Sequence, residues 1–179
     1  YEVLRSYHGC IFALDEHLAR FQRSADEIHI PGVDIAKIRG RILEAFAQAK
    51  LENAKIYFHL TRGCELRDHL PSADLKSAFF LTVQALQDDP QKKQRGIKVS
   101  THPDCRWKRC DIKSLNLLPN ILARMDADRK GCTEAILVNE AGRITEGAGS
   151  AFFGINGKAK TLHTHPLGPA ILPSITRAV

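Results

Sequence analysis

Alternating hydrophobic and polar positions predict a first unit built from strands and two helices. The strands are expected over residues 1–7, 10–14, 54–62 and 78–86. Asp15 and Asp34 suit helix N-caps, and apolar residues recur behind each of them at helical spacing. The first helix is expected to end at Pro31-Gly32. The polar stretch 63–76 lies between the last two strands and is long enough to be a functional loop.

The second half of the chain has short strand patterns and one clear helix. Strands are expected over residues 96–101, 134–138, 143–145, 150–155 and 159–163. The helix over 117–130 has Pro119 in its first turn and Gly131 just beyond its end, which is the usual asymmetry of helix termini. A final helix is expected to open at Pro173. The segment 87–95, QDDPQKKQR, is wholly polar and favours a linker.

These elements predict an α+β protein with two domains. Residues 1–86 form a smaller α/β sandwich of one sheet and two helices, residues 87–95 a linker, and residues 96–179 the first part of a larger, mainly β domain. The chain starts at Tyr1 inside a strand pattern and stops at Val179 inside a helix pattern. We therefore expect the larger domain to be incomplete in this chain.

Composition narrows the class of protein. The chain has 179 residues and is 44% hydrophobic, which is ordinary for a globular protein. No apolar run approaches the roughly 20 residues of a membrane helix. The net charge of +6 is scattered, with one cluster at 106–109, and nucleic-acid binding would need a longer basic stripe. Five cysteines without a C-x-x-C pair favour free thiols and a cytoplasmic location.

One lysine stands out in the stretch RCDIKSLNLLPN, residues 109–120. Lys113 is expected at the end of a short extended segment just before a helix, among Leu115, Leu117 and Leu118. Apolar neighbours can desolvate an amine, which lowers its pKa and makes it a usable nucleophile or base. From the local residues alone, a surface lysine in a loop is the alternative.

This stretch resembles the catalytic-lysine segment of the fold-type IV aminotransferases, which use pyridoxal phosphate. Further motifs of that family occur in the same order from residue 1 to residue 179: YEVLRSY, DEHLARFQRSA, HLTRGCELRDH, GCTEAILVNEAGRITEG and ILPSITR. The chain looks most like the D-amino-acid aminotransferases of the family. The resemblance implies transfer of an amino group from a D-amino acid to a 2-oxo acid, through a Schiff base on Lys113, in a homodimer.

The resemblance also assigns residues to the cofactor. Glu146, in the ITEG motif, would face the pyridine nitrogen, although TEG alone could equally be a surface turn. Arg20 would bind the phosphate, where a solvated helix face is the alternative, and His17 one turn earlier is expected to be structural. The full set of cofactor-binding residues is Arg20, Lys113, Glu146, Leu172, Ile175 and Thr176. Backbone N–H groups and the Thr176 hydroxyl would complete a phosphate site at the start of the last helix.

Substrate choice is predicted from Arg67 and His69 in the long loop. A guanidinium fork beside a histidine is a sound receptor for a carboxylate, and R-x-H looks like the carboxylate trap of D-amino-acid aminotransferases, to which Tyr1 also contributes. In those enzymes the loop reaches over from the neighbouring subunit. Asp68 could neutralise Arg67 or point away from it.

Several alternatives remain open at this stage. Ala148 and Gly149 stand where the family pattern leads us to expect serines, which leaves the hydrogen bonds of that loop in doubt. Branched-chain aminotransferase, amine transaminase and aminodeoxychorismate lyase share the fold. A basic nucleic-acid-binding module is a remote alternative. His163 and His165 have no evident third ligand nearby, and no metal is expected.

Overall fold

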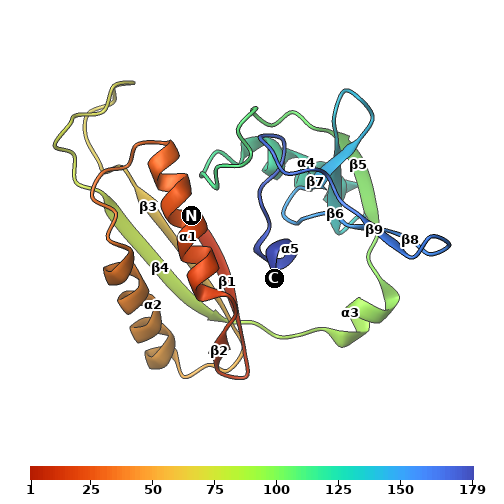
Figure 1. Ribbon diagram of the computed structural model, residues 1–179, viewed down its shortest axis with the longest axis horizontal. Coiled ribbons are helices and arrows are strands. Elements are labelled where there is room, and N and C mark those ends of the chain that lie inside the picture. The colour runs from red at the N-terminus through yellow and green to blue at the C-terminus, as the bar shows by residue number, and fades with distance from the viewer. The chain divides into compact units, whose positions relative to one another are not determined.

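The chain folds as two units, Tyr1–Asp88 and Asp89–Val179, in a computed structural model (Figure 1). The structure describes residues 1–179 apart from the side chain of Lys92. Both units combine helices with a sheet. The mixed fold confirms the predicted α+β class.

The first unit is an antiparallel sheet covered by two helices. Its strands are β1 (Glu2–Tyr7), β2 (Cys10–Ile11), β3 (Ala54–Thr61) and β4 (Ala78–Ala85), in the order β2-β1-β3-β4. The helices α1 (Leu14–Glu27) and α2 (Ile35–Ala49) lie between β2 and β3 in the chain. Both lie over one face of the sheet (Figure 1), where alternate strand residues and the apolar faces of the helices form one core. The fully buried strand residues of this core are Leu4, Ala54, Ile56 and Phe58.

The predicted start of α1 was wrong, whereas the start of α2 is confirmed. Strand β2 has only two residues, and Ala13 then adopts a left-handed conformation with φ 51° as the N-cap, with no side-chain cap. Asp15 lies in the first turn, where a carboxylate still favours the positive end of the helix dipole. At α2 the carboxylate of Asp34 accepts the N–H of Lys37 at 2.9 Å, as expected of an N-cap.

Helix α1 also ends earlier than predicted. It stops at Glu27, ahead of Pro31-Gly32, because His29 is left-handed with φ 54°. The guanidinium of Arg62 donates to the carbonyl oxygens of Ile28 and His29, which satisfies groups that the helix end leaves open. A long-range contact, rather than the local proline and glycine, therefore terminates this helix.

The second unit combines a three-stranded sheet with smaller elements. Strands β5 (Val99–Pro103) and β6 (Glu134–Val138) are parallel and joined through helix α4 (Leu118–Arg129), while β7 (Ile144–Gly147) pairs antiparallel with β6. The remaining elements are α3 (Pro90–Arg95), the hairpin β8 (Gly154–Asn156) and β9 (Thr161–His163), and α5 (Ile175–Ala178). The buried core residues are small or aliphatic: Ala123, Ala127, Ala135, Leu137 and Ala148.

Several boundaries in the second unit differ from the prediction. The polar segment 87–95 contains helix α3, and β5 begins at Val99 rather than residue 96. The last helix begins at Ile175 with Ser174 as its N-cap, not at Pro173. In contrast, α4 is confirmed, with its proline in the first turn and Gly131 at φ 69° just beyond its end. The Asp34 cap and both ends of α4 were therefore predictable from neighbouring residues, whereas the equally local Ser174 cap was missed.

Two global features bear on the setting of the protein. All five cysteines are free thiols. Among the described residues, no helix combines the length and the apolar character that a membrane span requires.

Candidate functional site

Glu146 is a buried carboxylate on β7. Its relative exposure is 7%, which rules out the surface-turn alternative. One carboxylate oxygen accepts a short hydrogen bond from Nη1 of Arg106, and the backbone N–H of Leu172 also donates to this side chain. Two segments distant in sequence therefore converge on one carboxylate.

Arg106 is the centre of this arrangement. Its Nη2 donates to Asp104 at 2.8 Å and to the carbonyl oxygen of Ala170 at 3.0 Å, while its Nε donates to Asp104 at 2.9 Å. The hydroxyl of Thr145, next to Glu146, also donates to Asp104. The bidentate pairing with Asp104 fixes the plane of the guanidinium, which is the geometry in which arginine binds most strongly.

Burial dominates the electrostatics of the cluster. It raises the pKa of Glu146 above its ordinary value, and the hydrogen bond from Arg106 opposes that rise without cancelling it. Burial alone would lower the pKa of Arg106, but the hydrogen bonds to Asp104 and Glu146 raise it. Burial likewise works to raise the pKa of Asp104, yet hydrogen bonds from Arg106 and Thr145 bring it below its ordinary value. Arg106 is thus a permanent cation inside the unit.

Lys113 lies within electrostatic range of this cluster. Its positive charge is one of the influences that lower the pKa of Glu146. The lysine is half-buried in an irregular segment that follows a turn, where a short extended segment before the helix was predicted. The expected apolar surroundings are only partly present, because Ile112 is buried whereas Leu115 and Leu118 are exposed.

The remaining candidates of the second unit lie at its C-terminal end. Leu172 contributes the backbone N–H that reaches Glu146. Ile175 and Thr176 are the first residues of α5, where Ile175 is buried and Thr176 is exposed. The structure thus brings Lys113, Glu146 and Leu172 together within one unit.

In the first unit, Arg20 is buried and paired, not on a solvated helix face. Its exposure is 5%, and its Nε and Nη2 donate to the carboxylate of Glu2 at 2.8 and 2.7 Å. His17 is also buried, with its Nδ1 2.8 Å from the same carboxylate. Glu2 lies on the same buried face of β1 as Leu4, and its contacts with Arg20 and His17 place it against α1.

The other face of this sheet carries an aromatic group that begins at Tyr1. The ring centroids of Tyr1 and Tyr57 are 5.9 Å apart, and the Tyr57 hydroxyl is 2.9 Å from Nδ1 of His59. Phe80 stacks on His59 with a centroid distance of 5.1 Å. These side chains lie opposite the buried ones because successive strand residues alternate between faces.

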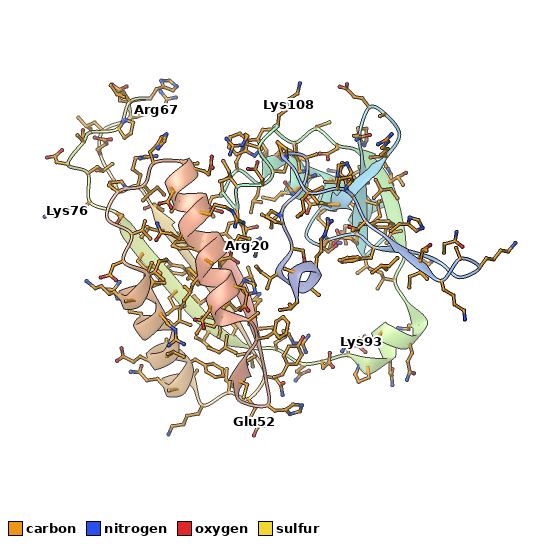
Figure 2. The ribbon with its side chains drawn as sticks, viewed as in Figure 1. Arg20, Glu52, Arg67, Lys76, Lys93 and Lys108 are labelled. Atoms are coloured by element: carbon orange, nitrogen blue, oxygen red, sulfur yellow. The ribbon has the colours of Figure 1, made fainter. Side chains whose placement is uncertain are left out.

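Arg67, which is labelled in Figure 2, and His69 lie on the long loop between β3 and β4. Both are exposed. Asp68 between them is turned to the backbone, since its carboxylate accepts the N–H of Leu70 at 3.0 Å. No hydrogen bond or ion pair between Asp68 and Arg67 is found among the described side chains, so the loop keeps Arg67 as an available cation.

This loop has its own internal structure. The carboxylate of Glu65 accepts the N–H of Ser72 at 3.1 Å and also the hydroxyl of Ser72. At its base Gly63 has φ 138°, and an added Cβ there would lie 2.5 Å from the carbonyl oxygen of Lys76. The two arms of the loop therefore approach closely at a position that only glycine fits.

Sequence reasoning missed two of the residues that hold this machinery, Arg106 and Glu2. Arg106 was counted only as part of a basic cluster, whereas its side chain is 8% exposed and paired with acids. Arg109 nearby is paired with Asp111 at 3.1 Å. Only weak sequence signals pointed to these two residues. Asp104 lies two positions before Arg106, and Glu2 is a charged residue among the buried positions of β1. Within the described residues, no group of three or more potential metal ligands is found.

Comparison with solved structures shows which known fold this chain has. A fold-type IV transaminase from Curtobacterium pusillum superimposes with a TM-score of 0.84 at 24% identity, over 99% of this chain and 62% of that one. The branched-chain amino acid aminotransferase of Thermobaculum terrenum, solved in its pyridoxal-phosphate form, gives a TM-score of 0.80 at 21% identity, over 99% of this chain and 61% of that one. Both show the same fold.

The sequence comparisons define the family. The amino-transferase class IV family matches residues 1–179. The D-alanine aminotransferase of Bacillus licheniformis is 36% identical over 181 residues, which cover 99% of this chain. The chain therefore belongs to the class IV aminotransferases. It spans 62% of the length of that relative.

Pyridoxal 5'-phosphate is the cofactor of this family, and the residues present fit it. The cofactor needs a lysine, an acid at its pyridine nitrogen and a cation for its phosphate. The second unit has a half-buried Lys113 in electrostatic range of the buried Glu146, so its lysine and its acid fit this cofactor. The first unit contains a buried cation, Arg20.

Replacing Asp104 with asparagine should destabilise the protein in a pH-dependent way. Because the folded-state pKa of Asp104 is lowered from 3.8, its charge stabilises the fold above that pH, and this contribution is lost as the pH falls through the folded-state value. Asp104→Asn should cost on the order of 2 kcal/mol at neutral pH and nothing in strong acid. Urea unfolding of the full-length protein across this range measures the difference.

The control for this prediction is Asp128→Asn, because Asp128 is exposed on α4. It should change the free energy of unfolding by less than about 0.5 kcal/mol. An Asp104→Asn cost that is equal at neutral and acid pH would show that the carboxylate charge is not what stabilises the cluster.

Proposed function

We propose that the full-length protein is a pyridoxal-phosphate-dependent transaminase that moves an amino group from a D-amino acid to a 2-oxo acid. The observation that carries the proposal is the buried Glu146 carboxylate, which Arg106 holds within electrostatic range of Lys113. The 36% identity with the D-alanine aminotransferase of Bacillus licheniformis supports a D-amino acid as the donor.

The chemistry divides between cofactor and protein. Bound pyridoxal phosphate supplies an electron sink for the bond that breaks at the substrate Cα. Glu146 would keep the pyridine nitrogen protonated, because a carboxylate stabilises a neighbouring N–H cation. Lys113 would carry the cofactor and, once released, take the proton from the substrate Cα as a general base. Arg106 would hold the Glu146 carboxylate in place during this step.

We assign the cofactor phosphate to Arg20 and to the start of α5. Glu2 fixes the orientation of the Arg20 guanidinium through two charge-assisted hydrogen bonds. Ile175 and Thr176 would add backbone N–H groups, and Thr176 also has a hydroxyl. Leu172 would contact the cofactor ring.

The substrate carboxylate is assigned to Arg67, His69 and Tyr1. The turn of Asp68 toward the N–H of Leu70 supports this role, because it leaves the Arg67 charge unopposed by its neighbour. We propose a homodimer in which this loop reaches over the active site of the second subunit, as the family resemblance implies. The five free thiols support a reducing, cytoplasmic setting.

Other activities of the same fold are the second candidates. Branched-chain aminotransferase, amine transaminase and aminodeoxychorismate lyase would all use the lysine, the glutamate and the phosphate contacts. The Arg67-x-His69 pair favours the D-amino-acid type over them. Nucleic-acid binding is disfavoured because two cations of the basic cluster, Arg106 and Arg109, are paired with acids of this chain.

Lys113 should be the residue that carries the cofactor. Borohydride reduction of the full-length holoenzyme should fix the cofactor to the peptide that contains Lys113, as read by mass spectrometry. The control is Lys108→Arg, which removes an exposed lysine five positions away and should leave both the visible absorption and the labelled peptide unchanged. A label on any other lysine would contradict the assignment.

Glu146→Gln should reduce turnover far more than cofactor binding. The variant keeps the shape of the side chain but loses the negative charge that keeps the pyridine nitrogen protonated. We therefore expect kcat to fall by about a hundredfold or more, while the cofactor Kd changes by no more than about threefold. Glu140→Gln, in the exposed turn after β6, is the matched control. Equal kcat values for the two variants would exclude this role for Glu146.

Arg67→Ala should discriminate between donors. Loss of the guanidinium should lower kcat/KM by about tenfold or more for D-alanine and D-glutamate, and should leave a simple amine unaffected because it has no carboxylate. Lys76→Ala removes an exposed cation from the end of the same loop and should affect none of them. A wild-type preference for L-leucine, or an equal loss with the amine, would overturn the D-specific assignment.

A further inference from the structure

We propose that Asn120 is a positioning residue that fixes the Glu146 segment relative to the Lys113 segment. The inference rests on the roles proposed above for Lys113 and Glu146. Asn120 lies in the first turn of α4, seven positions after Lys113 in the sequence. Its side-chain Nδ2 donates to the carbonyl oxygen of Ala148 at 2.8 Å. Ala148 is two positions after Glu146, so one hydrogen bond joins the two segments.

The residues after Glu146 form a tight loop that also forms hydrogen bonds with β6 and α4. The N–H of Gly147 donates to the carbonyl oxygen of Ser150, and the N–H of Ala148 donates to that of Ala135 on β6, both at 2.8 Å. Asn120 satisfies the Ala148 carbonyl from the other side. Both backbone polar groups of Ala148 are therefore paired, as a residue with only 7% exposure requires.

Ser150, at the end of this loop, is hydrogen-bonded to Glu134 on β6. Its hydroxyl donates to the Glu134 carboxylate at 3.1 Å, and Arg124 on α4 lies 3.6 Å from the other oxygen of that carboxylate. An added Cβ on Gly147 would lie 2.2 Å from the Ser150 hydroxyl and would displace it from Glu134. Apart from its internal bond between Gly147 and Ser150, the segment is therefore held by contacts with α4 and β6.

This arrangement accounts for Ala148 and Gly149, which stand where serines are expected. These two positions have no hydroxyl, and Asn120 supplies a side-chain hydrogen bond to the backbone of Ala148, two positions after Glu146. Loss of the Asn120 amide would leave the Ala148 carbonyl unsatisfied and loosen the end of β7. Glu146 would then be less exactly placed, and a small displacement at a reacting site is costly in rate.

The test compares Asn120→Leu with Asn116→Leu in the full-length holoenzyme. Leucine has nearly the shape of asparagine but no N–H, and Asn116 is an exposed asparagine of the same segment. Asn120→Leu should lower kcat by at least about tenfold, with the donor KM changed by less than about twofold. It should also shift the pH midpoint of the visible absorption band and speed amide hydrogen exchange over residues 147–150. Asn116→Leu should change none of these.

A second variant keeps the test decisive if Asn120→Leu does not fold. Asn120→Ser shortens the side chain while keeping its polarity, and should show the same direction of change in kcat and in hydrogen exchange. Wild-type kcat and exchange in either folded Asn120 variant would overturn the inference. Absence of a visible band in the wild-type holoenzyme would instead defeat the proposed function, and the exchange measurement would still decide whether Asn120 anchors the loop.

Discussion

The buried ion pair between Arg106 and Glu146 is the interaction on which the site of the second unit depends. Moving two charges out of water is expensive, and the cost is offset only when each charge has further partners. Arg106 has them in Asp104 and the carbonyl oxygen of Ala170, and Glu146 has the N–H of Leu172. The pair therefore ties β7 to the segment before Lys113 and to the segment that leads into α5. A carboxylate held in this way is already oriented before any ligand arrives.

In the first unit a buried ion pair also orients a candidate residue, but there the candidate is the cation and its partner is the acid. There Arg20 is the functional candidate, and the fully buried Glu2 is the residue that orients it. In both units a candidate cofactor contact is a charged side chain whose position is set by an ion pair with another strand or helix. Removing either supporting residue would leave a buried charge without its partner, which is more damaging than removing the pair. We therefore expect substitutions of the supporting residues, Glu2 and Arg106, to be as damaging as substitutions of the residues that they orient.

Local features of the fold could be predicted from the sequence, whereas the support of the site could not. The Asp34 cap, the proline in the first turn of α4 and Gly131 at its end depend on neighbouring residues, and all three are confirmed. The contact from Arg106 to Glu146 spans 40 positions, and no periodic pattern reveals it. The left-handed start of α1 at Ala13 has no composition signal either. Glu146 and Lys113 were predicted through family resemblance, and their surroundings only became visible in three dimensions.

The protonation state of the pyridine nitrogen is the quantity that tests this account most directly. It can be measured by ¹⁵N NMR on the full-length protein reconstituted with cofactor labelled at that nitrogen. A carboxylate at Glu146 that Arg106 holds beside the ring should give the chemical shift of a protonated nitrogen at neutral pH. The shift of an unprotonated nitrogen would contradict the placement of Glu146 at the cofactor, whatever the substrate of the enzyme.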